Sequence, residues 1–287
     1  MENTTGTIPV VKVLFALYPG MDALNVLGPL EILNKANHNI NDNNTGAFDC
    51  TYASATPTVE SEQGVLFKSD ASFEEIHKHL KEFDILIIPG GDFETVIKSK
   101  AQPLQIIKAF SDVQQKYPDK ERTLMAIGTA SLLLAHVGTL AGLSATTHPE
   151  YYTKFENINT DTSRRDLSER SNLLEERYVV NNLRFDLGED IDVNPYIRKK
   201  SDARRPSNAR KGSNSWKESN TRRESNARRA AMLLGGLRVI TSGGTGCGMD
   251  AALYLVSIMV SVDSANEAAR LLQHVWTKGV VVDGVDV

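Results

Sequence analysis

Residues 122–148 constrain the fold of this chain more than any other stretch, because their pattern predicts a buried strand, a sharp turn and a buried helix. Residues 124–127 form a short apolar run that is typical of a buried strand. Gly128 interrupts this run, Thr129 can cap the next element, and residues 131–137 are typical of an apolar helix. The stretch then continues through a glycine turn to His148.

A strand, a tight turn and a helix in this order form the geometry of a nucleophile elbow. Such a turn lifts one side chain above the carboxyl edge of a parallel sheet, and the amino end of the helix behind it favours negative charge. Here the elbow position is Gly128, which has no side chain. The sequence therefore raises the question of whether this site performs covalent chemistry.

Apolar runs alternate with helical patterns along most of the chain. This alternation predicts a mostly parallel sheet with helices on both faces. Strands are expected at residues 10–17, 48–53, 84–88, 124–127, 179–180 and 237–241, with a hairpin at 58–68. Helices are expected at residues 25–36, 72–83, 102–116, 131–137, 249–261 and 264–276, with Asn25 and Ser264 as caps of the first and last.

Ligands of open α/β sheets bind where the carboxyl ends of the strands meet. The loop with Gly90 and Gly91, the elbow at Gly128, and the glycine-rich loop at residues 242–248 all come directly after predicted strands. We therefore expect these three loops to meet at one edge of the sheet, with backbone N–H groups free to face a ligand.

Composition excludes several classes of protein. The net charge of −4 argues against general binding of nucleic acid. Two cysteines fit a reducing compartment, and neither a signal peptide nor a membrane-spanning apolar run is found, so a cytoplasmic location is expected. His77 and His79 are two residues apart and do not share a helix face, so no metal site is predicted.

One region departs from the α/β pattern. Residues 198–229 are rich in Arg, Ser and Asn and poor in apolar residues, so they cannot bury enough surface to offset their ordering entropy. We predict one domain over residues 8–280, interrupted by a disordered basic insertion at about 184–234. The insertion is either a tolerated surface loop, sequence carried in by a faulty gene prediction, or a basic contact and phosphorylation segment.

The ordered motifs of the chain resemble the ThiJ/PfpI superfamily of class I glutamine amidotransferase-like proteins. The resemblance is carried by DALNVLGPLEIL, DILIIPGG, AIGTASLLLAHVG, ATTHP and VITSGGTGCGMDAALYLV, which begin at residues 22, 84, 126, 145 and 239. Among its members, the isonitrile hydratase branch is most similar. The resemblance implies a flavodoxin-like sandwich, a homodimer, a small-molecule ligand and no cofactor.

The resemblance also assigns roles to the candidate site. The family normally has a reactive cysteine at the elbow, where this chain has Gly128, and an acidic residue where it has Asn25. Thr129 and His148 match family positions, and Gly90 and Gly91 match a loop that supplies an oxyanion-binding N–H. Gly243, Gly244 and Cys247 lie in the matching glycine-rich loop, and Glu31 matches an acid that we expect to face the pocket.

These residues suggest two functions. The first is an isonitrile hydratase-like enzyme that adds water to R–N≡C and gives an N-substituted formamide. Because Gly128 supplies no thiolate and Asn25 no acidic proton, it would orient its reactants without covalent bonding, through Asn25, Thr129, His148 and the loop N–H groups. The second is a pseudoenzyme that binds a metabolite or a protein partner. A transcription regulator is disfavoured, because the segment after Trp276 is too short for a helix-turn-helix.

Several of these candidate site residues also have a simpler interpretation that involves no catalysis. Asn25 and Thr129 are good helix caps without any catalytic role, and His148 can hydrogen-bond only locally. Cys247 lies at the start of a helix, a position that lowers the pKa of a thiol, so it is either a relocated nucleophile or a small buried residue.

Overall fold

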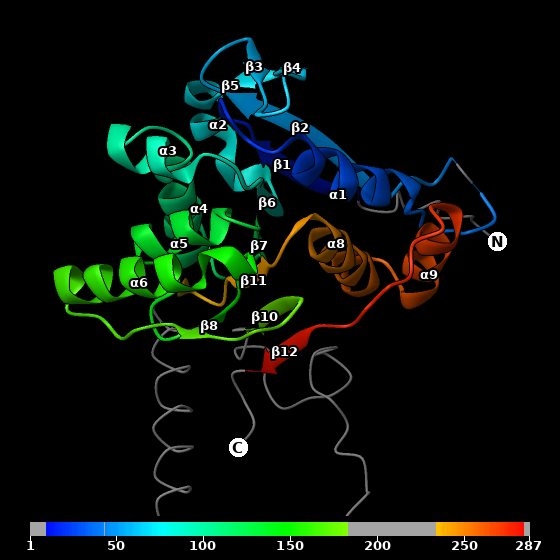
Figure 1. The fold of residues 1–287 in the computed structure, drawn as a ribbon. Helices are drawn as coiled ribbons and strands as arrows, with labels where there is room; N and C mark the ends of the chain where they lie inside the picture. Colours follow the sequence, from blue (N-terminus) through cyan, green and yellow to red (C-terminus); the bar gives the residue numbers. More distant parts are fainter. Residues whose placement is uncertain (1–9, 43, 183–233, 284–287) are drawn as a thin grey trace, which may run out of the picture.

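The structure is a computed structural model that describes residues 10–42, 44–182 and 234–283. The predicted basic insertion at 184–234 lies outside the described residues except for Leu234. The strands on either side of the insertion belong to one sheet, as Figure 1 shows.

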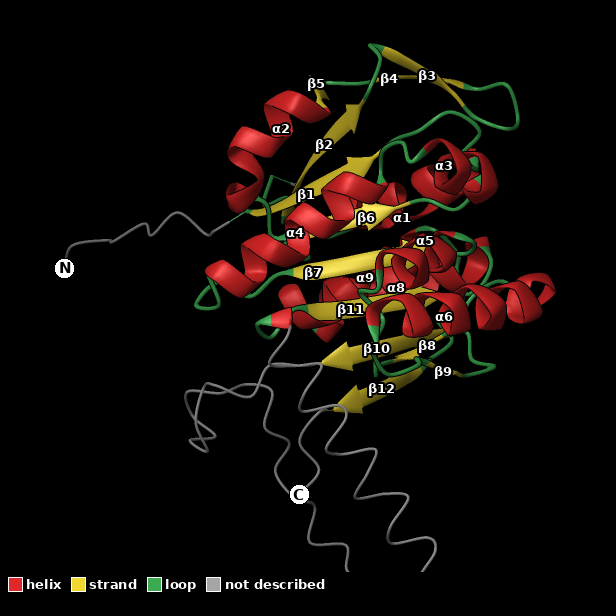
Figure 2. Cartoon of the chain, turned by 90° about the vertical axis from the view of Figure 1, so that its left-hand side faces the viewer, coloured by secondary structure: helices red, strands yellow, loops and turns green. Residues whose placement is uncertain are grey.

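An eight-stranded sheet forms the centre of the fold, with the order β12-β10-β11-β7-β6-β1-β2-β5. Every neighbouring pair is parallel except β10 with β11. Figure 2 shows β10 and β12 running against the direction of the other strands. The bounds are β1 Val11–Ala16, β2 Phe48–Ser54, β5 Ala71–Ser72, β6 Ile85–Ile88, β7 Thr123–Ile127, β10 Tyr178–Asn182, β11 Arg238–Ser242 and β12 Val280–Asp283.

The strands at the middle of the sheet are buried on both faces. All residues of β6, β7 and β11 are buried, and accordingly β6 is a continuous apolar run and β7 is one after its first residue. β11 instead buries Arg238, Thr241 and Ser242 beside two apolar residues. The patterns at 84–88, 124–127 and 237–241 predicted these three strands.

Helices cover both faces of the sheet, as predicted. On one face α1 (Ala23–Lys35), α8 (Thr245–Met259) and α9 (Val262–Leu271) pack against one another (Figure 1). The other group consists of α2 (Phe73–His79), α3 (Phe93–Ser99), α4 (Leu104–Lys116), α5 (Ala130–Val137) and α6 (Tyr152–Asp166). None of the helices in the described ranges is long and apolar enough to cross a bilayer.

Short elements complete the chain. The predicted hairpin is confirmed as β3 (Thr58–Glu60) and β4 (Leu66–Lys68), with Gly64 in its turn. A second small pair joins β8 (Ser144–Ala145) to β9 (Asn172–Leu173). Two 3-10 turns, η1 (Leu80–Glu82) and η2 (Pro149–Tyr151), lie after α2 and before α6, respectively.

Two predicted helix caps are wrong. Asp22, not Asn25, caps α1 by accepting a hydrogen bond from the N–H of Leu24. Ser261, not Ser264, caps α9, and α9 ends at Leu271, before the predicted Trp276. In both helices the predicted cap lies three residues after the true one and is of a type that caps helices equally well. Local propensity therefore could not choose between the predicted and the true cap. The pattern of the sequence also left α3, α6 and β12 unpredicted.

Asp250 of α8 is fully buried and holds several segments together. One carboxylate oxygen accepts from Arg177, 2.7 Å from Nε and 2.5 Å from Nη2. The other lies 2.8 Å from Nε2 of His274 and 3.1 Å from the backbone N of Thr277. The backbone oxygen of Arg177 in turn accepts from the N–H of Gly243. Through Arg177, the carboxylate of Asp250 therefore fixes the position of Gly243 in the glycine-rich loop.

Replacing Asp250 by Asn should lower the free energy of unfolding by about 1–2 kcal/mol, because Arg177 and His274 lose the charge of their buried partner, while the partly exposed Arg177 stays solvated. Urea unfolding followed by circular dichroism measures this change. The control is Glu267→Gln, which breaks the exposed pair with Arg270 and should leave stability unchanged. Equal stability of the wild type and the Asp250→Asn variant would contradict the role given to this carboxylate.

Candidate functional site at the elbow

The turn between β7 and α5 has the geometry of an elbow. Gly128 is buried and has a φ of +58°, a left-handed conformation that L-residues adopt only at a cost. Its N–H donates to the backbone oxygen of Ser242, 3.1 Å away. Its carbonyl oxygen accepts from Oγ of Ser131 at 3.0 Å and from Oγ1 of Thr147 at 3.1 Å. Since both hydroxyls are fully buried, the peptide groups of the elbow are held at the N–H and at the carbonyl oxygen of Gly128.

A Cβ on Gly128 would fit between its neighbours without a clash. A Cβ built there would lie 3.6 Å from Nδ2 of Asn25 and 3.6 Å from the backbone oxygen of Gly243, both ordinary contact distances. The elbow therefore has room for at least a Cβ atom, which glycine lacks.

The loop after β6 approaches the elbow so closely that residue 90 must be glycine. A Cβ on Gly90 would lie 2.7 Å from the backbone oxygen of Ile127, 2.9 Å from Nδ2 of Asn25 and 3.1 Å from the backbone N of Thr129. The preceding Pro89 is held by the buried hydroxyl of Tyr18, which donates to its carbonyl oxygen at 2.9 Å. Burial raises the pKa of Tyr18, so this hydroxyl keeps its proton.

Thr129 does not cap α5 with its side chain. Its hydroxyl oxygen accepts from the N–H of Gly91 at 2.8 Å and donates to the carbonyl oxygen of Gly91 at 3.0 Å. The prediction of a free N–H at Gly91 is therefore wrong, because that group already has a partner. Thr129 instead ties the loop after β6 to the elbow.

Asn25 is brought to the elbow by the first turn of α1. Its side chain is almost completely buried, and its Oδ1 accepts from the hydroxyl of Thr245 at 3.0 Å. Nδ2 is left facing Gly90 and Gly128, without an acceptor among the described residues. Asn25 is thus a donor aimed into the elbow.

The glycine-rich loop after β11 forms the third wall. Gly243 is the last residue but one before α8, and Gly244 occupies the cap position of that helix. The half-buried ring of His148 lies beside Gly244, with Cδ2 3.4 Å from the position of a Cβ there. Nδ1 of His148 accepts from the N–H of Glu150 at 3.4 Å, so the local hydrogen bond expected of this residue is present.

Cys247 does not have the reactivity that its position suggested. Its thiol is half-buried beside Gly243, and burial raises its pKa in spite of the nearby Arg177 guanidinium, which acts to lower it. The predicted lowering of the pKa by the helix start is therefore wrong. Desolvation of the thiolate outweighs the helix and the guanidinium.

Glu31 does not face the site. It lies on the exposed side of α1 with Leu27 and Leu24, one and two helical turns away, which are 39% and 56% exposed. Asn25 and Glu31 are six residues apart, so they lie on different sides of the helix. The expectation that Glu31 lines the pocket is wrong.

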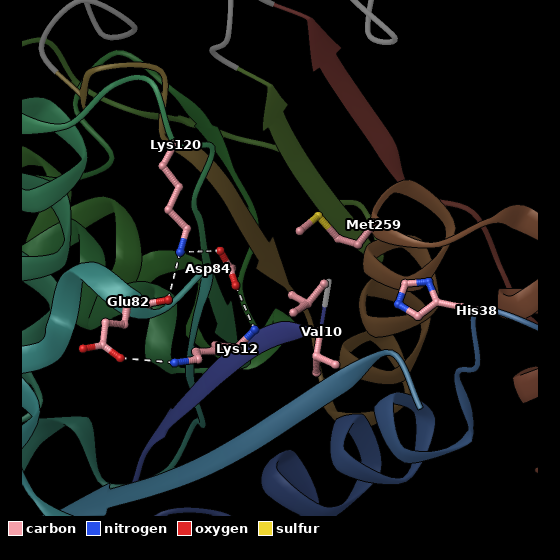
Figure 3. Close-up of a pocket in the computed structure, with 8 residues that line it drawn as sticks. Val10, Lys12, His38, Glu82, Asp84, Lys120 and Met259 are labelled. Atoms are coloured by element: carbon pink, nitrogen blue, oxygen red, sulfur yellow. Dashed lines mark hydrogen bonds and ion pairs between the residues drawn. The ribbon is translucent and has the colours of Figure 1, made fainter. Parts of the chain in front are cut away.

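Two cavities lie away from the elbow. One of about 540 Å³ is at the amino-terminal edge of the sheet, next to Lys12 at the start of β1 (Figure 3). Its charges pair with each other, as Lys12 with Glu82 and Lys120 with Asp84. The other, of about 500 Å³, lies between α3, α5 and α6 over Phe93 and Ile158. Neither contains the elbow, and in the described ranges no cluster of three His, Cys, Asp or Glu side chains could bind a metal ion.

The structure thus brings together most of the predicted site residues and leaves out Glu31. Sequence reasoning missed the partners that orient them, namely Tyr18, Ser131, Thr147 and Thr245. Thr147 and Thr245 lie inside the ATTHP and SGGTGCG motifs, so their positions carried a signal. Ser131 and Tyr18 could not be recognised without the three-dimensional contacts.

Comparison with known proteins identifies the family. A profile of the DJ-1/PfpI family matches residues 11–183. The chain belongs to the DJ-1/PfpI family. No curated protein matches the sequence of this DJ-1/PfpI member.

Solved structures share its fold at low identity. DJ-1beta of Drosophila melanogaster is 16% identical, with a TM-score of 0.56 over 93% of this chain and 100% of that one. DJ-1 of Schizosaccharomyces pombe is 18% identical, with a TM-score of 0.54 over 92% and 100% of the two chains. A ThiJ/PfpI family protein of Pseudomonas syringae is 14% identical, with a TM-score of 0.54 over 94% and 78%. These matches cover more than nine-tenths of the chain and show that it shares the fold of these proteins.

Cys247 of this DJ-1/PfpI member should be alkylated slowly at pH 7. Its raised pKa reduces the thiolate fraction at neutral pH, so its reaction with iodoacetamide should keep accelerating above pH 9. Mass spectrometry of the peptide that contains it measures the rate, with Arg177→Met expected to slow it further. Cys50 is an internal control, since burial raises its pKa to about 12. Rapid, pH-independent alkylation of Cys247 near pH 7 would show that its pKa is low.

Proposed function

We propose that this DJ-1/PfpI member binds a small polar molecule at the elbow without forming a covalent bond to it. The observation that carries the proposal is a hydrogen-bond donor and an acceptor that both lie beside Gly128, where there is no side chain. The donor is Nδ2 of Asn25, and the acceptor is the backbone oxygen of Gly243. A molecule that accepts from the first and donates to the second gains two hydrogen bonds there.

The residues around the elbow do not assemble a covalent catalyst. Gly128 has no side chain, and the hydroxyl of Thr129 is engaged with Gly91 in both directions. The thiol of Cys247 has a raised pKa. A nucleophile needs a base within hydrogen-bond distance, and Nδ1 of His148, one of its two ring nitrogens, accepts from Glu150. This arrangement favours binding over covalent catalysis.

A second candidate is hydration of an isocyanide without a cysteine, which the resemblance to isonitrile hydratases supports. A water molecule that accepts from Asn25 and donates to Gly243 would be oriented at the elbow. This candidate predicts that the unmodified protein converts methyl isocyanide to N-methylformamide. Formamide only from the Gly128→Cys, Asn25→Asp double variant would show instead that the surrounding frame is intact and that covalent chemistry is missing.

Binding at the elbow should disappear in Gly128→Ala, because the added methyl group contacts both Nδ2 of Asn25 and the carbonyl oxygen of Gly243 and blocks a ligand from them. Ligand-observed NMR with a set of neutral, anionic and cationic fragments of a few heavy atoms measures it. The matched control is Gly64→Ala, where φ is +78° and nothing lies within 4 Å of an added Cβ. Both variants bear a similar left-handed strain, about 1 kcal/mol, but only the first alters the elbow. The proposal fails if no fragment loses its signal in Gly128→Ala.

A further inference from the structure

One of the two cavities away from the elbow has the features of a binding site of its own. It is the cavity of about 500 Å³ between α3, α5 and α6, where α5 packs against both of the other helices (Figure 1). Its volume is within the range of pockets that bind small molecules, roughly 300–1,000 Å³. No residue of the elbow site lines this cavity, so what binds there is independent of the proposed function.

The floor of the cavity is apolar. Phe93 at the start of α3 is 4% exposed, and its ring meets the ring of Tyr151 edge-on, with the two centroids 5.6 Å apart. Ile97 of α3 and Ile158 of α6 are partly buried and pack against the core. A ligand that lies on these side chains removes apolar surface from water, which favours a ligand with an apolar body.

A buried hydroxyl without a hydrogen-bond partner also lines the cavity. Thr162 of α6 is 6% exposed, and its Oγ1 makes no hydrogen bond with any residue that the structure describes. Thr160, two residues earlier on the same helix, instead donates to the backbone oxygen of Glu156 at 2.8 Å. A buried hydroxyl without a partner costs free energy, and a ligand group in the cavity would remove that cost.

The imidazole of His136 is a second uncharged polar group on the wall. It is half-buried in the last turn of α5, and neither ring nitrogen has a hydrogen-bond partner in the described part of the chain. Burial and the nearby guanidinium of Arg165 lower the pKa of His136 against the opposing effect of Asp166, so the ring is neutral at pH 7. A neutral imidazole offers one donor and one acceptor to a ligand.

The cations around the cavity already have acidic partners. Their charges are therefore balanced within the protein, and an uncharged ligand is favoured over an anion. The one carboxylate of the lining that lacks such a pair, Asp161, is exposed and stays hydrated, so it attracts a cation only weakly. The existing pairs are Lys98 and Lys154 with Glu94, and Arg165 with Asp166.

From these observations we propose that the cavity between α3, α5 and α6 binds an uncharged molecule with an apolar body and a hydroxyl group, such as a phenol. The hydroxyl of the ligand forms a hydrogen bond with Oγ1 of Thr162, and the ring of His136 is its second partner. Because a hydroxyl both donates and accepts, it can satisfy Thr162 and His136 in either direction. The apolar body lies on the floor formed by Phe93, Ile97 and Ile158.

The test compares four naphthalenes that differ only in the group at position 2, namely 2-naphthol, 2-methylnaphthalene, 2-naphthoate and 2-naphthylmethylammonium. Titration of the full chain followed by NMR should give a Kd for 2-naphthol at least about fivefold below that of each other probe, because only 2-naphthol supplies an uncharged hydroxyl.

Two matched variants test the partner in the protein. Thr162→Val removes the hydroxyl and keeps the shape of the side chain, so it should raise the Kd of 2-naphthol about fivefold. The same variant should not lower the urea midpoint of unfolding, because it breaks no hydrogen bond within the described structure. The control is Thr160→Val on the same helix, which lies outside the cavity and should leave the Kd unchanged.

Equal binding of 2-methylnaphthalene, or tighter binding of either charged probe, would overturn the proposal, as would a Kd for 2-naphthol that Thr162→Val leaves unchanged. Loss of binding in Gly128→Ala but not in Thr162→Val would place the probe at the elbow, which contradicts this second site and supports the proposed function. If none of the four probes binds, the second site is wrong, and the proposed function, which concerns the elbow, is unaffected.

Discussion

The left-handed backbone of Gly128 is the constraint on which the rest of the site depends. The turn is held by a hydrogen bond from its N–H to Ser242 and by two buried hydroxyls on its carbonyl oxygen. These contacts come from β11, from α5 and from the segment before His148, so three parts of the chain converge on one peptide. The elbow thus remains rigid even though it presents no side chain, and this rigidity keeps the donor and the acceptor at fixed positions.

The position of the acceptor, the carbonyl oxygen of Gly243, depends on the buried carboxylate of Asp250, which acts through Arg177. Gly243 donates to the backbone oxygen of Arg177, and the guanidinium of Arg177 is held by Asp250, whose carboxylate is fully buried. The position of the donor is set by Thr245 at the start of the same helix. One helix, α8, therefore orients both sides of the elbow, which explains why a site without a nucleophile keeps a defined geometry.

The sequence predicted the sheet and the meeting of three glycine-containing turns at one edge of it, because most of the buried parallel strands are apolar runs and the turns after them contain glycine. It could not predict which polar groups were already paired. Asn25 and Asp22 are equally good caps, and only the contact of Asn25 with Thr245 shows that its amide faces the elbow. The N–H of Gly91 was expected to be free, yet Thr129 accepts its hydrogen bond. Cys247 shows the same limit, since the burial that raises its pKa comes from residues distant in the sequence.

The most direct test of this account is a crystal structure of the protein at a resolution that separates the nitrogen and oxygen of the Asn25 amide through their hydrogen bonds. The account predicts bound water or ligand atoms beside Gly128, within hydrogen-bond distance of both Nδ2 of Asn25 and the carbonyl oxygen of Gly243. An empty, apolar space there, or an Asn25 amide whose nitrogen is bonded within the protein, would contradict it.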